Sequence, residues 1–327
     1  MNPSIVIVTH RGGALLQRCV EALNNQSVRP SSILVVISSK TNVPTPPGVD
    51  TLWLKENVGY ATAANTGLEA HKGRPVILLN DDTIPHADFI KALKDASKSP
   101  GIYQPRILLA AHPDKIENTG HCILPDGFNI ARARGQQRNT ELPQSVGAFS
   151  GAAVMFTPEV YENLGGFDEQ LESFGEDLDL SLRALRHGFL IHYVRDAVVL
   201  HELGATYGRT SPQKVHLVER NRIQAATRSL PFTALVTMPI WSALRLGTLG
   251  LAAAAGRGIG SGVGAQGMMA IATGNAAGVR YVPRALRKRW IDKHTWQRKD
   301  REMWQLLLLH RIRMRDWFPP NWETQSQ

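Results

Sequence analysis

The sequence contains few cysteines: Cys19 and Cys122 are the two in 327 residues. Their positions fit neither a metal-ligand spacing nor a disulfide framework, which excludes disulfide-stapled folds and favours a reducing compartment. The N-terminal region also lacks a signal-peptide pattern, because the apolar run at residues 4–9 is short and no basic segment precedes it. We therefore expect a cytoplasmic protein.

Long apolar runs are also scarce. A membrane-spanning helix needs ~20 consecutive apolar residues. Within the largely apolar residues 230–255 the uncharged run at 233–244 is too short, and Pro231, Pro239 and Arg245 interrupt the pattern. We expect this stretch to form helices that lie on a membrane or against the rest of the protein.

Acidic residues are scarce in residues 280–317, where twelve Lys or Arg stand against four Asp or Glu and account for eight of the formal net charge of +9. Four of the seven tryptophans lie in the same region: Trp290, Trp296, Trp304 and Trp317. Trp among basic side chains favours an anionic membrane interface. The alternative is a solvated helical tail packed on the body. We predict a helical, basic, membrane-associating region over 229–327, in which the glycine-rich residues 256–278 form either a flexible connection or a helix-packing surface.

Before residue 228 the chain alternates short β-branched strands with amphipathic helices. Strands are expected at 5–9, 32–37 and 75–79, and helices at 14–25 and 60–71. This order predicts an α/β domain over 1–228, built on a parallel sheet wrapped by helices. In such open sheets, ligands bind at the carboxyl ends of the strands.

Two carboxylates, Asp81 and Asp82, directly follow the strand expected at 75–79. Mg²⁺ and Mn²⁺ take oxygen ligands, and one or two carboxylates suffice when substrate phosphates complete the shell. The alternative is a helix cap, in which Asp82 or Thr83 caps a helix that begins near Pro85. These residues alone leave both interpretations open.

Other polar residues also follow expected strands. Thr9, His10 and Arg11 end the first strand, and His201 ends an apolar run at 197–200. A single histidine is usually structural, but at a strand end it is also a candidate metal ligand.

Small residues fill the segment 57–67, which includes Asn57, Gly59 and Asn65. They would let the backbone approach a ligand, with the amides of the helix start facing phosphate or sugar hydroxyls. Packing of the helix through a small-residue face explains the same pattern equally well.

Three acids, Glu176, Asp177 and Asp179, open another expected helix. The helix dipole favours acids in a first turn, which explains at least one of them. A helix start would also hold a carboxylate rigidly as a general base.

Taken together, these motifs resemble family 2 glycosyltransferases of the GT-A fold over about residues 3–225, most nearly the bacterial rhamnosyltransferase-like enzymes of cell-wall and surface polysaccharide synthesis. The resemblance rests on the Val-rich first strand, Asn57-x-Gly59 with Asn65, Asn80-Asp81-Asp82, Ser150-Gly151-Ala152, Gly166-Phe167-Asp168-Glu169, Glu176-Asp177-x-Asp179 and His201. The segments 219–223 and 282–289 also look like that subgroup. The resemblance implies a GT-A (Rossmann-like nucleotide-diphospho-sugar transferase) domain with a mainly helical C-terminal extension.

The resemblance also implies roles for individual residues. Asp82 would bind a divalent metal, Mn²⁺ or Mg²⁺, that bridges the donor diphosphate, and His201 would be a further metal ligand. Asn80 replaces the first acid of the family's Asp-x-Asp element. Asp177 would be the catalytic base and Glu176 its acidic neighbour.

The donor implied is a nucleoside-diphosphate sugar of dTDP or UDP type. The donor-binding residues would be Thr9, His10, Arg11, Ser38, Asn57, Gly59, Asn65, Asn80 and Asp81, and the acceptor side would include Gly151 and Ala152. The sequence departs from the family after the second strand, where Ile37-Ser38-Ser39-Lys40 replaces the usual Asp-Asn-x-Ser. It also lacks the Gln-x-x-Arg-Trp motif of processive synthases, so we expect addition of one or a few sugars.

The expected reaction is metal-dependent transfer of a sugar, with L-rhamnose suggested by the subgroup, to a hydroxyl of a glycan or a polyprenyl-diphosphate-linked acceptor at the inner face of a membrane. Inversion is expected because no second nucleophilic carboxylate is evident in the sequence. The alternatives are a non-catalytic nucleotide-sugar-binding relative and a nucleotidyltransferase. No nucleic-acid partner is expected, because acids at strand ends would repel phosphate unless a metal intervened.

Overall fold

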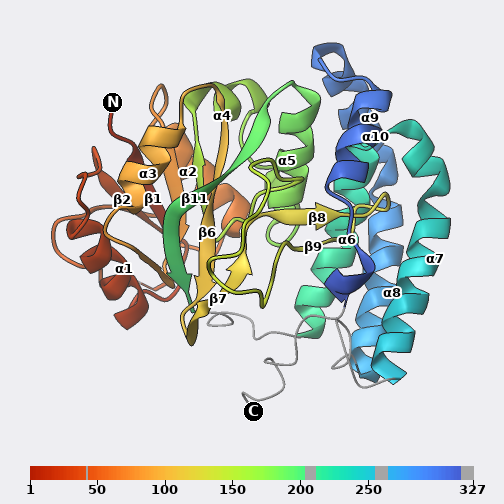
Figure 1. The fold of residues 1–327 in the computed structure, drawn as a ribbon, viewed down its shortest axis with the longest axis horizontal. Helices are drawn as coiled ribbons and strands as arrows, with labels where there is room; N and C mark the ends of the chain where they lie inside the picture. The colour runs from red at the N-terminus through yellow and green to blue at the C-terminus, as the bar shows by residue number, and fades with distance from the viewer. Residues whose placement is uncertain (42, 203–210, 255–263, 318–327) are drawn as a thin grey trace.

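The computed structural model describes residues 1–41, 43–202, 211–254 and 264–317, and its centre is a nine-stranded mixed sheet (Figure 1). The strand order is β3-β2-β1-β4-β10-β6-β11-β5, and β7 pairs with β6. The strands are β1 Ser4–Thr9, β2 Ile33–Ile37, β3 Asp50–Trp53, β4 Val76–Asn80, β5 Thr83–Pro85, β6 Gly101–Leu109, β7 His112–Asn118, β10 Ala153–Phe156 and β11 Leu190–His201. A separate hairpin joins β8 His121–Ile123 to β9 Asn129–Ala131.

Helices cover both faces of this sheet (Figure 1). The helices of the α/β part are α1 Ala14–Asn24, α2 Tyr60–Glu69, α3 Phe89–Ala96, α4 Pro158–Leu164 and α5 Glu176–Arg186. Along β1, Ile5 and Ile7 pack into the core on one face with Leu16 of α1, while Val6 packs into the core on the other face with Ala64 of α2. This alternation explains why strands buried on both faces are apolar at nearly every position.

The strands and helices expected between residues 5 and 79 are confirmed to within two residues at each end. The expected helix near Pro85 is misplaced, because Thr83–Pro85 forms β5 and α3 begins at Phe89. The interpretation of Asp82 or Thr83 as a helix cap is therefore wrong. Both cysteines are buried.

A helical region follows the sheet and stands to one side of it (Figure 1). Its helices are α6 Pro212–Ser229, α7 Phe232–Ala254, α8 Ala265–Arg280, α9 Val282–Asp292 and α10 Asp300–Leu309. α8 packs closely on α6, since a Cβ on Gly274 would lie 2.6 Å from His216 O. Of the two interpretations of the glycine-rich segment, helix packing is thus confirmed for α8, while residues 256–263 lie outside the described residues.

α7 is longer than the sequence suggested. Within the described part of the chain, one helix is long and apolar enough to cross a membrane, at Phe232–Leu251 with a mean hydropathy of 1.3. The expected interruptions do not shorten this helix, because Pro239 lies inside it and Arg245 does not end it, so by length and composition alone it meets the requirement for a span. That it lies on a membrane stays a prediction. The Arg245 side chain turns inward, where it binds Glu219 and Asp126.

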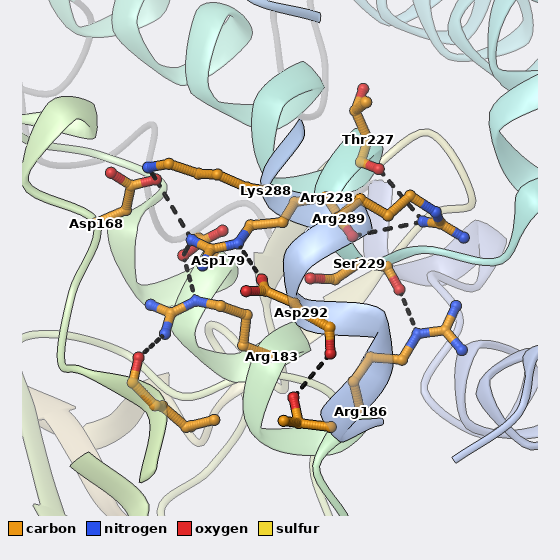
Figure 2. A network of polar contacts seen from close by, with 12 residues as sticks. Asp168, Asp179, Arg183, Arg186, Thr227, Arg228, Ser229, Lys288, Arg289 and Asp292 are labelled. Carbon is orange, nitrogen blue, oxygen red and sulfur yellow. Dashed lines mark hydrogen bonds and ion pairs between the residues drawn. The ribbon is translucent and has the colours of Figure 1, made fainter. Parts of the chain in front are cut away.

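Much of the positive charge of residues 280–317 is used inside the protein. Arg298 donates to carbonyl oxygens at the end of α5 and just beyond it, and Arg289 does the same at the end of α6. Lys288 contacts Asp168 at 2.5 Å, while Arg228 lies between Asp168, Asp179 and Asp292, as Figure 2 shows. Because these cations pair with helix ends and carboxylates, they fasten the C-terminal helices to the α/β part.

Candidate active site at the carboxyl edge of the sheet

The carboxyl ends of the parallel strands form one edge of the sheet, and the candidate site lies there. β1 ends at Thr9, β4 at Asn80 and β11 at His201. Because β10 runs in the opposite direction, Gly151 and Ala152 lie beside the end of β4, where Asn80 N donates to Ala152 O at 2.9 Å. The fold thus brings together predicted site residues that are far apart in the sequence.

Asp81 is tied to the end of β1. The Thr9 hydroxyl donates to Asp81 Oδ2 at 2.5 Å and accepts from Gly12 N at 2.9 Å. Burial raises the pKa of Asp81 to about 6, opposed by the hydrogen bond from Thr9 and reinforced by the charge of Asp82. Asp81 therefore connects two strand ends through its own side chain.

Asp82 and His201 form a buried pair. β5 and β11 place Thr83 opposite His201, and His201 Nε2 lies 3.1 Å from Asp82 Oδ1. The other ring nitrogen, Nδ1, donates to Glu117 Oε2 of β7 at 2.8 Å. Sequence reasoning missed Glu117, because it lies inside an antiparallel strand and carries no strand-end signal.

The surroundings of His201 are strongly negative. Burial lowers the pKa of His201, but the carboxylates of Glu117 and Asp82 outweigh burial and raise this pKa to about 10. A site that favours positive charge on an imidazole also favours a bound cation.

The donor atoms of this pair fit a divalent cation whose shell is completed by ligand oxygens. Asp82 Oδ1 is buried without a hydrogen-bond partner of good geometry. Glu117 orients the imidazole through the nitrogen that faces away from Asp82, as is usual for metal-binding histidines. In the described ranges, no three His, Cys, Asp or Glu side chains form a complete metal site. Asp82 and His201 would therefore need diphosphate oxygens as further ligands, which Mg²⁺ and Mn²⁺ accept.

Glu176 and Asp177 open α5 and face the start of β10. Asp177 Oδ2 accepts from Gly151 N at 3.4 Å, and its Oδ1 accepts from Leu178 N at 2.8 Å. Glu176 is buried, and its Oε2 has no hydrogen-bond partner. Burial first, and then the charge of Asp177, raise the pKa of Glu176 to about 8. Glu176 is thus mainly protonated at neutral pH, beside a carboxylate that reaches the backbone of Gly151.

Asp179, the third acid of this motif, is structural. It forms ion pairs with Arg183 at 2.7 Å and with Arg228 at 3.3 Å. Figure 2 shows it within the polar network between α5, α6 and α9. All three acids lie in the first turn of α5, where the helix dipole favours them, and no side chain caps the helix.

Tyr60, which sequence reasoning also missed, joins the two halves of the site. Its hydroxyl donates to Gly151 O at 2.8 Å. Burial raises the pKa of Tyr60, and the carboxyl groups of Glu176, Asp177 and Asp82 raise it further when they are ionised. The candidate base and the Tyr60 hydroxyl therefore meet at the backbone of Gly151. The position of Tyr60 directly after Asn57-x-Gly59 was the available signal.

The predicted residues on the nucleotide side gather at the ends of β1 and β2. They are Thr9, His10, Arg11, Ser38, Asn57 and Gly59. His10 Nδ1 donates to Ser38 O at 2.8 Å, and Ser38 Oγ accepts from Val58 N at 3.1 Å. Asn57 Oδ1 accepts from Gly59 N at 3.2 Å.

Asn65 lies apart from this group. Its amide donates to Phe167 O and Glu169 Oε1, both at 3.0 Å, and accepts from Phe167 N at 2.8 Å. At the start of the same helix, Ala61 N donates to Glu172 O at 3.0 Å. A Cβ on Gly67 would lie 2.3 Å from Val6 Cγ1, so close packing of this helix on β1 is confirmed. The donor-binding roles of Asn57, Gly59 and Asn65 stay predictions.

A family model described as "Glycosyltransferase like family 2" matches residues 2–224. Among curated proteins, an N-acetylglucosaminyl-diphospho-decaprenol L-rhamnosyltransferase of Mycobacterium tuberculosis is 29% identical over 237 residues, which cover 63% of this chain and 77% of that protein. A pre-mycofactocin glycosyltransferase of the same species is 27% identical over 157 residues, or 47% of this chain and 32% of that one. The family model agrees with the expected sugar transferase and not with the nucleotidyltransferase alternative.

Solved structures share the fold at low sequence identity. GalNAc-T7 with UDP, GalNAc and Mn²⁺ matches 69% of this chain and 48% of its own, with a TM-score of 0.55 and 17% identity. Residues 1–349 of S. aureus TarS match 93% of this chain and 92% of their own, with a TM-score of 0.51 and 12% identity. The second match extends through the C-terminal helices.

Proposed function

The chain belongs to family 2 of the glycosyltransferases and has the GT-A fold, and from this we propose that it is a metal-dependent, inverting, non-processive glycosyltransferase that uses a nucleoside-diphosphate sugar of dTDP or UDP type. The observation that supports the proposal most directly is that the Tyr60 hydroxyl and the Asp177 carboxylate both contact the backbone of Gly151, beside the end of β4 that leads into Asp82. Glycosyl transfer needs both a charge-stabilising group at the diphosphate and a base at the acceptor hydroxyl.

Asp82 and His201 are the residues proposed to hold the metal, and Mn²⁺ or Mg²⁺ bound there would neutralise charge on the departing nucleoside diphosphate. Asp177 accepts the proton of the acceptor hydroxyl. Glu176, mainly protonated because burial raises its pKa to about 8, leaves Asp177 as the carboxylate that takes this proton. Tyr60 holds Gly151, and with it the backbone N–H that orients Asp177.

We assign the nucleotide side to the ends of β1 and β2 and the acceptor side to Gly151 and Ala152. Among the predicted donor ligands, Ser38 and His10 are already held in place by hydrogen bonds. They would therefore contact the nucleotide without first changing their position. The catalytic domain proposed is 1–228, with 229–327 as its helical extension.

L-Rhamnose is the proposed sugar, and a polyprenyl-diphosphate-linked glycan is the proposed acceptor. The support is the mycobacterial relative, whose name states an N-acetylglucosaminyl-diphospho-decaprenol acceptor and L-rhamnosyl transfer. Synthesis of cell-wall or surface polysaccharide on the cytoplasmic side of a membrane would follow.

The test is a thermal-shift panel of UDP-, dTDP- and GDP-sugars with and without Mn²⁺. A ligand present at 100 times its dissociation constant stabilises the folded state by about 2.7 kcal/mol. We expect dTDP-L-rhamnose to stabilise the protein, and only with the metal. A second assay measures transfer to N-acetylglucosaminyl-diphospho-polyprenol. NMR of the product should show the anomeric configuration opposite to that of the sugar in the donor. A product that retains the donor configuration would contradict inversion.

We propose that the C-terminal region docks on an anionic membrane through α7. Phe232, Val236, Ile240 and Leu244 recur every fourth residue and are each at least 60% exposed. This spacing places them on one face of the helix. Arg245 binds Glu219 on another face, which favours a helix that lies in the membrane plane over one that crosses it.

On α9, Leu286 and Trp290 are also exposed, and Arg287 and Lys293 flank them. Apolar and aromatic side chains beside exposed cations match an anionic lipid interface. We expect the double variant Val236→Gln, Ile240→Gln to lose flotation with phosphatidylglycerol-containing liposomes while it stays folded. Leu190→Gln, an exposed apolar position on β11, is the control. Equal flotation of both variants would count against membrane docking through α7.

A further inference from the structure

The loop that leads into α5, residues 171–175, has a strained backbone. Glu172 has φ 64° and ψ −75°, and Ser173 N donates to Leu171 O at 2.8 Å, which together form a γ-turn with positive φ at its centre. Such turns are rare and strained. Phe174, with φ 65°, is a second non-glycine residue in the left-handed region. A loop with two such residues persists only where its surroundings hold it in place.

Asn221 of α6 holds this loop. The side chain is fully buried, and its amide nitrogen contacts the carbonyl oxygens of Leu171 at 2.8 Å, Ser173 at 3.1 Å and Phe174 at 2.6 Å. Its Oδ1 accepts from Arg220 Nε at 2.9 Å, which fixes the orientation of the amide. At Gly175, an added Cβ would lie 3.0 Å from Asn221 Cβ, so the backbone also packs directly on this residue.

Arg220 supports the same loop from its edge. Its guanidinium donates to Leu171 O at 3.1 Å and to Glu172 Oε1 at 3.2 Å. Two residues later, Arg222 points elsewhere and pairs with Asp126 and Glu219. The segment Glu219–Ile223 resembled the subgroup in sequence but had no assigned role. In the structure, Arg220 and Asn221 bind the loop, whereas Glu219 and Arg222 bind the helical region.

The opposite side of the loop contacts the candidate active site. Glu172 O accepts from Ala61 N at 3.0 Å, and Ser173 Oγ accepts from Tyr60 N at 3.5 Å. The loop then continues directly into Glu176 and Asp177. It therefore lies between the starts of α2 and α5, the two helices that present Tyr60 and Asp177 to Gly151.

We propose that Asn221 is a positioning residue that sets the direction of Asp177 by holding the loop 171–175 in its strained conformation. The inference rests on the proposed role of Asp177 as base. A base must lie within hydrogen-bond reach of the proton that it takes, and a displacement of about 1 Å can lower a rate about 100-fold. Loss of the amide should thus affect turnover more than donor binding.

The experiment compares Asn221→Ala with Asn275→Ala. Asn275, on α8, is a matched control, since its amide donates to Glu219 Oε2 at 3.0 Å and to Ile271 O at 2.8 Å and accepts from Arg222 at 2.7 Å, all outside the loop. With dTDP-L-rhamnose, Mn²⁺ and N-acetylglucosaminyl-diphospho-polyprenol, we expect Asn221→Ala to lower kcat about 10- to 100-fold and to change the donor KM less than about threefold. Asn275→Ala should lower Tm but keep kcat within about twofold.

Two further readouts separate positioning from general destabilisation. Hydrogen exchange of backbone amides in 171–179 should accelerate in Asn221→Ala and not in Asn275→Ala, and this arm needs no substrate. Adding Glu172→Gly to Asn221→Ala should restore part of kcat, because glycine adopts a positive φ without steric cost. If Asn221→Ala does not fold, Arg220→Ala removes two contacts with the same loop and takes its place.

Equal exchange rates in the two variants, or equal values of kcat, would overturn the proposal. The proposed function has a separate arm, the variant Asp177→Asn. If Asp177→Asn keeps its kcat, the role of Asp177 as base fails. If Asp177→Asn loses activity while Asn221→Ala does not, only the positioning role fails.

Discussion

Buried charged groups occur in two regions of this protein, and their surroundings differ. In the helical region, Arg245 binds Glu219 at 2.7 and 2.8 Å and Asp126 at 3.0 Å, while Arg222 binds the same two acids. At the carboxyl edge of the sheet, Glu176 Oε2 is buried without a hydrogen-bond partner, and Asp82 Oδ1 is buried 3.1 Å from His201 Nε2 without a hydrogen bond of good geometry.

The first set of charges is paired within the fold, whereas the second set leaves oxygens without good hydrogen bonds, as the proposed metal and acceptor sites require. A buried polar atom without a good hydrogen bond is costly, and in a stable protein it is usually explained by function. In the network of the helical region, each buried cation already pairs with buried carboxylates. The acids at the sheet edge, Asp82 and Glu176, gain further stabilising contacts only when a cation, a substrate hydroxyl or a proton binds to them.

The largest expected effect is on turnover. Asp177→Asn keeps the shape of the side chain but removes the base, and general-base catalysis contributes about 10²- to 10⁴-fold. We expect kcat to fall by that factor while donor-induced thermal shifts and Tm stay unchanged. Asp179→Asn, two residues later, should do the reverse: Tm falls because the pair with Arg183 is broken, and kcat stays within about threefold. A similar kcat loss in both variants would remove the distinction between the two acids.

The next effect is on stability. Glu219→Ala leaves Arg245 and Arg222 buried with fewer acceptors, and breaking a buried pair on one side costs about 3–5 kcal/mol. Urea unfolding should show this loss. Adding Arg245→Met should recover part of it, because the unpaired cation is removed. A loss below about 1 kcal/mol would mean that the network is not the main tie between α6 and α7.

The third effect concerns pH. The folded-state pKa of Glu176, about 8, lies above its ordinary value of 4.5, so folding favours the protonated form. Its contribution to stability is full below pH 4.5 and is lost as the pH rises toward 8, at up to about 1.4 kcal/mol per pH unit.

Glu176→Gln cannot ionise, so the difference in unfolding free energy between variant and wild type should grow in favour of the variant from pH 5 to pH 8. Urea unfolding at several pH values measures this difference, in which other titrating groups cancel. A difference that does not vary with pH would contradict the raised pKa.

The smallest expected effect is on metal affinity. Glu117 accepts from His201 Nδ1, and removal of such a partner typically weakens metal binding about 10- to 100-fold. Glu117→Gln should reduce Mn²⁺ affinity by that factor in a titration followed by electron paramagnetic resonance with dTDP present. Asp114→Asn, an exposed change on the same strand, is the control. Unchanged affinity in Glu117→Gln would show that Glu117 does not orient His201 for the metal.

The parts of the fold that depend on local pattern were predictable. The strand at 5–9, the helix at 14–25 and the acids at 176–177 followed from periodicity and from residues at helix starts. The misplaced helix near Pro85 shows the limit. Residues 83–85 pair with the distant strand β11, so the segment that suggested a helix start forms a short antiparallel strand instead.

The site was predictable only where its residues follow strands. Asp82 and His201 carry that signal, whereas Glu117 and Tyr60 acquire their positions through pairing of β6 with β7 and packing of the start of α2. Asn221 has no chemical signal at all, since its role depends on a loop 47 to 50 residues away in the chain.

Order along the chain was enough to identify the α/β alternation, the acids that end or begin its elements and the excess of Lys and Arg near residue 300. Short-range spacing carries this information, because strand and helix periodicity and capping preferences act between near neighbours. Which charges are paired is a different matter. Burial and partners depend on contacts between distant segments, so the folded structure was needed to show that Asp179, Arg245 and Lys288 are bound within the protein. It was also needed to show that Asp82 lies beside His201 and that Glu176 keeps an oxygen without a partner.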